Sequence, residues 1–164
     1  MEKVKSVMDK TIASTCAILL AFMTLLTIYQ VIMRYAFKSP STVSEELLGY
    51  SFVWVSLLGT ALVFGQKDHM KITLLSDKVK GKGQVVLSVF TELLIMAIAI
   101  GVFILGGQRF MEIGSLQLSP TINIEMHWIY IIIPICGVLI MVYNILNIIQ
   151  DIQKNYKSRR GELQ

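Results

Sequence analysis

The sequence predicts an all-α integral membrane protein with four transmembrane helices and with both termini in the cytoplasm (N-in/C-in). Of its 164 residues, 54% are hydrophobic and only 16% are charged, a composition too apolar for a soluble domain of this size. The charges lie in short blocks between long uncharged runs. A helix of about 20 residues crosses the roughly 30 Å of hydrocarbon in a bilayer. We therefore expect residues 1–164 to form a single membrane domain, with short amphipathic interfacial helices in its connectors.

The first predicted span covers residues 11–33 and follows a basic N-terminal stretch. A secretory signal peptide also begins with basic residues, but its apolar region has only about 7 to 15 residues. The longer run here indicates a helix that is retained. Ala13, Ala17 and Ala21 recur every four residues, and we expect this small-residue face to pack closely against another helix.

The second predicted span covers residues 47–65, and charged residues precede it. Arg34 lies at the end of the first apolar run, and the carboxylates Glu45 and Glu46 open the second, with Ser44 as the expected helix cap. An arginine and two carboxylates on either side of a short loop could form an ion pair at the membrane edge. Such a pair would fix a hairpin corner or would contribute directly to docking a partner.

The connector over residues 66–84 is basic and has amphipathic spacing. Ile72, Leu75 and Val79 fall at positions i, i+3 and i+7 and so form one apolar stripe of a helix. Lysines lie on an adjacent stripe. This pattern predicts a helix that lies in the headgroup plane of the membrane.

The third predicted span covers residues 85–107 and contains Glu92, the only carboxylate deep in an apolar run. It lies about 10 Å along the helix from its start, where a charged side chain must find a partner, reach the interface or take up a proton. Both a structural or subunit-contact role and an ion-handling role are open for it. Ala97 and Gly101 offer a second site for close helix packing.

The connector over residues 107–127 alternates apolar and polar side chains, and we expect it to lie partly in the membrane interface. The fourth predicted span follows over residues 126–149, with Trp128 as an aromatic anchor at its boundary. Pro134 removes one helical hydrogen bond and should bend this helix. We expect the amides of the two asparagines in the span, Asn144 and Asn147, to bond across helices.

The distribution of basic residues predicts the orientation. Of the 15 lysines and arginines, all but three fall on the N-terminal flank, the connector 66–84 or the C-terminal tail. Cytoplasmic flanks of membrane helices carry the excess of basic residues. The termini and the connector 66–84 are therefore predicted to be cytoplasmic, and the connectors 34–46 and 107–127 periplasmic. The periplasmic connectors hold the three remaining basic residues, Arg34, Lys38 and Arg109.

Catalytic, metal and cofactor sites are not expected. His69 and His127 are predicted to lie on opposite sides of the membrane, so they cannot share a metal. Cys16 and Cys136 form no CxxC pair, which disfavours a thiol oxidoreductase, and no nucleotide-binding loop or hydrolase motif is present. The basic residues flank apolar spans and form no continuous surface for nucleic acid. We expect no enzyme, no cofactor and no nucleic-acid partner.

A motif spread over residues 34–69 resembles the small membrane subunit (DctQ-like) of tripartite ATP-independent periplasmic (TRAP) transporters. Its order is Arg-Tyr-x-Phe, Ser-Glu-Glu, Trp, Gly-x-Ala and His, and the family usually has Trp where this chain has Val43. The resemblance continues through Ser119-Pro120, Trp128-Ile129-Tyr130 and Pro134. The residues that carry the motif are Arg34, Tyr35, Phe37, Ser44, Glu45, Glu46, Trp54, Gly59, Ala61 and His69.

The resemblance implies a bacterial inner-membrane transporter with three components. A large membrane subunit would carry the substrate and sodium, and a periplasmic binding protein would deliver an organic acid such as sialic acid or a C4-dicarboxylate. This chain would be the non-catalytic subunit that braces the large one among membrane lipids, since it lacks the broken helices and repeats of carriers. Its periplasmic connectors are where the binding protein would touch it, with Lys38, Ser41, Arg109 and Glu112 as candidate contacts.

Two other functions are weighed against this one. The first is a self-sufficient proton-coupled exporter in which Glu92 carries the proton. That function needs a carboxylate at the bilayer midplane among aromatic residues, whereas Glu92 is off-centre with Phe90 as its nearest aromatic in the sequence. The second is a membrane oxidoreductase, which needs paired thiols or quinone-binding side chains that the sequence lacks.

Overall fold

A computed structural model describes residues 2–66 and 82–161 of the chain, with side-chain surroundings for residues 3–65 and 90–150. The described part is helical apart from its connectors and one isolated β-bridge, between Leu118 and Glu125. Its elements are α1 (Glu2–Tyr35), α2 (Thr42–Gln66), α4 (Lys82–Ile98), the π-helix η1 (Ala99–Gly106), α5 (Gly107–Gly114), α6 (His127–Tyr130) and α7 (Ile132–Gly161).

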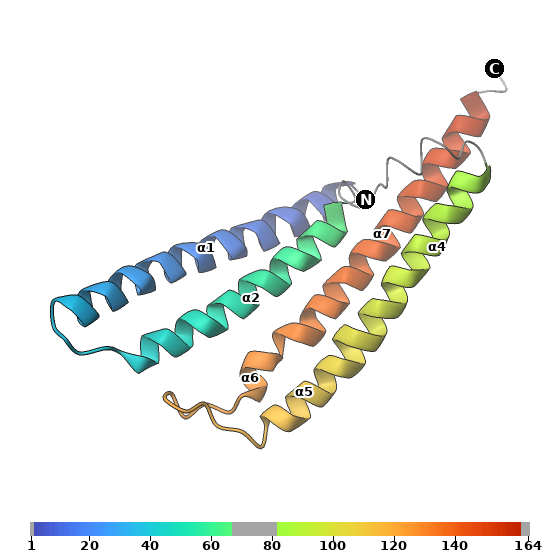
Figure 1. The fold of residues 1–164 in the computed structure, drawn as a ribbon. Helices are drawn as coiled ribbons and strands as arrows, with labels where there is room; N and C mark the ends of the chain where they lie inside the picture. The colour runs from blue at the N-terminus through green and yellow to red at the C-terminus, as the bar shows by residue number, and fades with distance from the viewer. Residues whose placement is uncertain (1, 67–81, 162–164) are drawn as a thin grey trace.

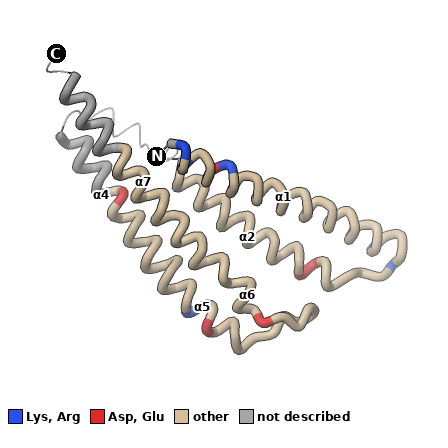
Figure 2. Tube along the Cα trace, turned by 180° about the vertical axis from the view of Figure 1, so that it is seen from behind, with Lys and Arg blue, Asp and Glu red and all other residues tan. Residues whose placement is uncertain are grey.

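Four helical segments of the described chain are long and apolar enough to cross a membrane, as the sequence predicts. Each contains most of a predicted span, and their charged residues lie mainly near the ends (Figure 2). The predicted interfacial helix and His69 fall within residues 67–81 and lie outside the described residues. The spanning segments are Lys3–Tyr35, Thr42–Gly65, Phe90–Gly114 and His127–Gln150.

The helices form two antiparallel pairs that lie side by side. Figure 1 shows α1 beside α2, and α4, η1 and α5 beside α6 and α7, with α2 and α7 in contact at the centre. The first half of α1 also reaches α7, because Ile12 and Cys16 of α1 pack in one cluster with Cys136 and Tyr143 of α7. The second half of α1 lies beside α2 and away from α7 (Figure 1).

The third span packs against α7 through its π-helical segment. A π-helix is wider than an α-helix and changes which residues face a neighbour. Ala99 and Phe103 therefore face α7, and a Cβ on Gly137 of α7 would lie only 2.8 Å from the Cβ of Phe103. The predicted packing site at Ala97 and Gly101 is wrong within this chain, because Ala97 is exposed and nothing lies within 4 Å of a Cβ on Gly101.

Two further local predictions about helix packing and capping are wrong. Within this chain, the face of Ala13, Ala17 and Ala21 packs against no helix, because all three are exposed. Ser44 is not the N-cap of α2, because the helix already begins at Thr42 and the Ser44 hydroxyl donates to the Ser41 carbonyl at 2.8 Å.

The bend predicted at Pro134 corresponds to a break between two helices. The helix α6 ends at Tyr130, and α7 begins at Ile132. Proline has no N–H to donate to the carbonyl four residues earlier, and its ring crowds that carbonyl. The residue four positions before Pro134 is Tyr130, so the interruption lies where the proline weakens the helix.

Candidate functional site

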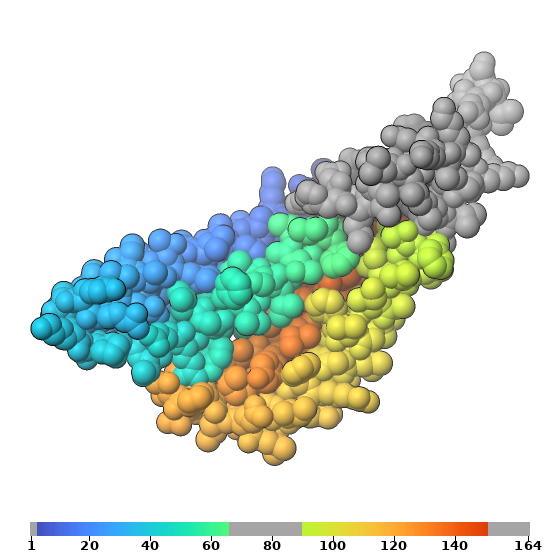
Figure 3. Space-filling model, viewed as in Figure 1, coloured from blue at the N-terminus to red at the C-terminus, as the bar shows by residue number. Residues whose placement is uncertain are grey.

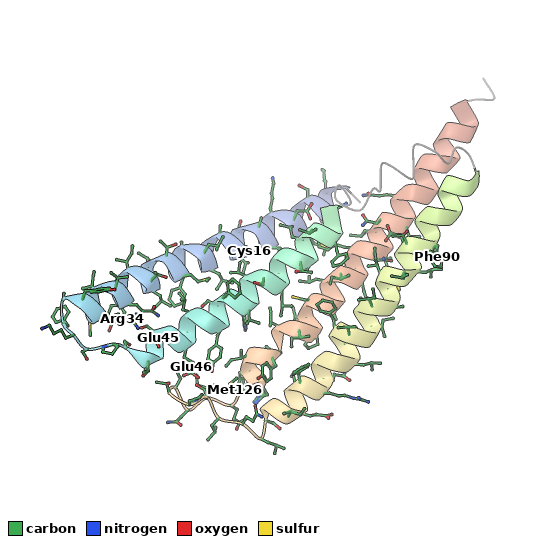
Figure 4. All side chains as sticks on the ribbon, in the orientation of Figure 1. Cys16, Arg34, Glu45, Glu46, Phe90 and Met126 are labelled. Carbon is green, nitrogen blue, oxygen red and sulfur yellow. The ribbon has the colours of Figure 1, made fainter. Side chains whose placement is uncertain are left out.

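The charged residues of the predicted motif, Arg34, Glu45 and Glu46, lie at the end of the bundle where α1 joins α2 and where α5 joins α6. We call this region the connector end, and it comprises residues 34–46 and 107–127. In Figure 4, Arg34, Glu45, Glu46 and Met126 all lie there. The predicted ion pair is present, with Arg34 Nη2 and a Glu45 carboxylate oxygen 3.5 Å apart. Both side chains are more than half exposed, so this pair adds little stability.

Glu46 makes the closest polar contacts at the connector end. Its Oε1 accepts hydrogen bonds from the hydroxyls of Tyr50 and Ser119, and its Oε2 accepts one from the Thr121 N–H at 3.1 Å. Hydrogen bonds to an ionised carboxylate are stronger than neutral ones. We call these four residues the Glu46 knot. The knot joins the first turns of α2 to a loop more than 70 residues later in the chain.

That loop is a short hairpin over residues 115–126. The Ser119 N–H donates to the Ile124 carbonyl at 2.8 Å, and the Met126 N–H donates to the Gln117 carbonyl at 3.0 Å. Asn123 has a φ of 57°, a left-handed conformation that asparagine tolerates and that lets the chain reverse. The predicted alternation of side chains thus corresponds to a hairpin, and the connector 115–126 contains no separate interfacial helix.

Two aromatic residues of the first half of α2, Tyr50 and Trp54, contact α6 and the residue before it. Trp54 donates its indole N–H to the Ile129 carbonyl at 3.1 Å, and the Tyr50 hydroxyl lies 3.4 Å from the Met126 sulfur. Between α1, α2, the hairpin and α6 lies a mainly apolar groove of about 240 Å³. Figure 3 shows the hairpin (orange) against the start of α2 (blue-green). Residues lining the groove include Leu19, Tyr50, Trp54, Ile124 and Trp128.

The remaining motif residues take no part in the Glu46 knot. Tyr35 is 76% exposed and Trp128 58% exposed at the surface. Gly59 faces outward, since nothing lies within 4 Å of a Cβ placed on it. Pro134 contacts α5, where its ring lies 2.9 Å from a Cβ placed on Gly107.

The four candidate contacts for a binding protein all lie at the connector end. Lys38, Arg109 and Glu112 are exposed, whereas Ser41 is half-buried and its carbonyl accepts the Ser44 hydroxyl. Arg109 and Glu112 lie on α5, and Lys38 and Ser41 lie in the loop before α2. The structure does not bring the four into one cluster.

Glu92 lies toward the opposite end of the bundle and contacts α7. The Asn144 amide donates both to the backbone carbonyl of Glu92, at 2.9 Å, and to its carboxylate, at 2.7 Å. Both residues are buried. Asn147 accepts a hydrogen bond from Lys5 of α1 at 3.1 Å, which confirms that both asparagines bond across helices.

The hairpin and its anchor could not be found from the sequence. The buried Ser119 hydroxyl donates to Glu46, yet a serine before a proline indicates only a turn. The Ser-Glu-Glu motif predicts a carboxylate near the membrane edge without indicating which of its two acids turns inward. No group of three or more His, Cys, Asp or Glu residues that could bind a metal occurs in the described part of the chain.

The chain matches one family model over most of its length. Residues 23–154 match the model described as "Tripartite ATP-independent periplasmic transporters, DctQ component". It is the same family that the motif over residues 34–69 resembles.

Individual relatives agree with the family match. The chain is 27% identical to a "Putative TRAP transporter small permease protein" of Haemophilus influenzae, over 93% of this chain and 94% of that protein. It is 29% identical to "Sialic acid TRAP transporter small permease protein SiaQ" of Vibrio cholerae, over 85% of this chain and 79% of that protein. It is also 29% identical to "Sialic acid TRAP transporter permease protein SiaT" of Haemophilus influenzae, over 83% of this chain but only 21% of that longer protein.

Proposed function

Because the chain belongs to the DctQ family, the small permease components of TRAP transporters, we propose that it braces the large permease subunit of a sodium-coupled organic-acid transporter. Members of this family are membrane subunits that work with a large permease subunit, so the chain is not an enzyme. We assign to this chain a passive role, and we also propose a substrate class, an orientation in the membrane and a set of periplasmic contacts.

The main support for this bracing role is the hydrogen bond that the Glu92 carboxylate accepts from Asn144. The alternative, a proton-coupled exporter, would need Glu92 to take up and release a proton during transport. In this chain the Glu92 carboxylate accepts a hydrogen bond from the buried Asn144 amide and so ties α4 to α7. The Tyr143 hydroxyl donates to Asp9 at 2.6 Å and ties α7 to α1. These bonds favour a fixed scaffold over the alternative of a proton-coupled exporter.

Reconstitution into vesicles tests the brace proposal. The large subunit, its periplasmic binding protein and this chain are expected to take up labelled solute when sodium is higher outside than inside. This chain reconstituted alone is expected to move none. Sodium-independent uptake by the full assembly would contradict the proposed coupling, and transport by this chain alone would contradict the brace.

The proposed substrate is an organic acid of the sialic acid or C4-dicarboxylate type. Two of the relatives carry sialic acid in their names, which favours that class. Competition of labelled sialic acid uptake by unlabelled sialic acid or succinate distinguishes the two classes. We expect sialic acid to compete and succinate to have no effect.

The proposed site is the bacterial inner membrane, with both termini in the cytoplasm. The excess of lysine and arginine on the terminal flanks and on residues 66–84 supports this orientation. The connector end then faces the periplasm. Its exposed side chains Lys38, Arg109 and Glu112, together with Ser41, are proposed contacts for the binding protein.

A further inference from the structure

We propose that Glu46 is a positioning residue: it fixes the hairpin 115–126 in the pose in which the periplasmic binding protein docks. This inference rests on the proposed docking role of the connector end, and it names the hairpin as part of the docking surface. It also separates Glu46 from Glu45, its neighbour in the sequence.

The two adjacent carboxylates have different tasks. Glu45 is exposed and reaches back to Arg34 of α1. Glu46 is turned the other way and accepts bonds from Ser119 and from the Thr121 N–H of the hairpin. Of the two adjacent carboxylates, only Glu46 is bonded to the hairpin, whereas the exposed Glu45 pairs weakly with Arg34.

The hairpin is closed by its own bonds but is placed by Glu46. Its internal hydrogen bonds, such as Ser119 N–H to the Ile124 carbonyl, keep the two arms together. Ser119 is 1% exposed, whereas Leu116 and Leu118 are 88% and 63% exposed. One buried hydroxyl thus anchors a loop whose Leu116 and Leu118 side chains are exposed. Removing the carboxylate leaves the internal bonds of the hairpin in place but removes the two hydrogen bonds that Ser119 and Thr121 make to α2.

The location of the hairpin points to a partner outside the membrane. It lies between the spanning segments Phe90–Gly114 and His127–Gln150, on the side opposite the N-terminus. In the proposed orientation this side faces the periplasm, where the binding protein arrives. A loop held in its bound pose avoids the cost of ordering it on binding. Docking should therefore weaken when Glu46 is lost, while the contacts between helices within the membrane remain.

Binding to the intact membrane complex tests the inference. This chain and its large subunit are placed in lipid nanodiscs, and the cognate periplasmic binding protein is titrated onto them. Glu46→Ala is expected to raise the Kd about tenfold because the loose hairpin must be ordered on docking. Glu45→Ala is the matched control: it removes an adjacent carboxylate that does not touch the hairpin, and its Kd is expected to stay within about twofold of the parent.

Hydrogen–deuterium exchange of the same complexes measures how firmly the hairpin is held, independently of the binding measurement. Exchange in residues 115–126 is expected to accelerate in Glu46→Ala and to stay unchanged in Glu45→Ala. Ser119→Ala removes one knot bond from the hairpin side and should shift both readouts in the same direction. Its effect should not add fully to that of Glu46→Ala, since both act on one contact. If the Glu46→Ala variant does not assemble with the large subunit, both measurements are made on the Ser119→Ala variant instead.

Three outcomes would overturn the inference. The first is faster exchange in the hairpin with an unchanged Kd, and the second is a raised Kd with unchanged exchange. The third is the absence of saturable binding to the parent complex. Co-purification with the large subunit distinguishes these outcomes from failure of the brace proposal, because Glu46→Ala is expected to leave the yield of the assembled pair unchanged.

Discussion

Polar side chains inside this apolar protein act mainly as ties between distant helices. Glu92 and Asn144 join α4 to α7, and Tyr143 and Asp9 join α7 to α1. An unpaired polar group in hydrocarbon costs several kcal/mol, so such groups are found in pairs. Within the described residues, buried polar side chains thus hold helices together at both ends of the bundle.

Replacing Glu92 tests this structural role at a single residue. Glu92→Gln keeps an oxygen that accepts the Asn144 amide, so we expect assembly to persist and uptake to stay within about threefold of the parent. Glu92→Leu cannot accept that bond, and we expect the yield of folded protein to fall. Uptake by reconstituted transporter and the recovery of folded protein in detergent are the two measurements.

Glu112→Gln is the control for folding, since Glu112 is exposed on α5 and its substitution should leave the recovery of folded protein unchanged. Abolished uptake by an intact Glu92→Gln complex would contradict the structural role. It would instead support an ion-handling carboxylate.

The π-helical turn of the third span forms the contact of this span with α7. The η1 segment brings Ala99 and Phe103 against α7, where Gly137 leaves room for their backbone and side chains. Gly59 of α2 has no neighbour within 4 Å of its Cβ position. The same residue type therefore has a packing role in one helix and none within this chain in the other.

A pair of alanine substitutions tests the packing of these helices. Gly137→Ala would place a Cβ 2.8 Å from Phe103 and 3.0 Å from Ile104, which forces the helices apart and should destabilise the subunit by about 1–3 kcal/mol. Gly59→Ala meets no neighbour and should leave stability unchanged or raise it by up to about 1 kcal/mol through helix propensity. Thermal unfolding of the purified subunit in detergent compares the two, and equal melting temperatures would contradict the described contact.

The two ends of the molecule are expected to face opposite sides of the membrane. The N-terminal end of α1 lies at the end of the α1–α2 pair opposite the connector end (Figure 1). Exposed side chains are available at both, at Ser6 and at Leu116. The proposed orientation places Ser6 in the cytoplasm and Leu116 in the periplasm.

Labelling of single cysteines tests this orientation in cells. With Cys16 and Cys136 replaced by serine, Leu116→Cys is expected to react with a membrane-impermeant maleimide in intact cells after the outer membrane has been opened. Ser6→Cys should react only after the inner membrane is disrupted. Labelling of Ser6→Cys from outside would reverse the assignment and place the connector end in the cytoplasm.

Features that are determined by residues close together in the chain were predictable from the sequence. Four spans, the break near Pro134 and the Arg34–Glu45 pair follow from hydropathy, from proline chemistry and from charges separated by a short loop. The order of the motif residues also identified the family. Each of these signals is contained in a local stretch, so no three-dimensional information was needed.

Only the tertiary structure decided which groups meet across long separations. The Glu46 hydrogen bond to Ser119 spans 73 residues, and the Asn144 bond to Glu92 spans 52. The π-helix moved the packing face away from Ala97 and Gly101, and the alanines of α1 face outward. Nearly uniform apolar spans carry little periodic signal, so the sequence could place these helices in a membrane but could not say which of their faces touch.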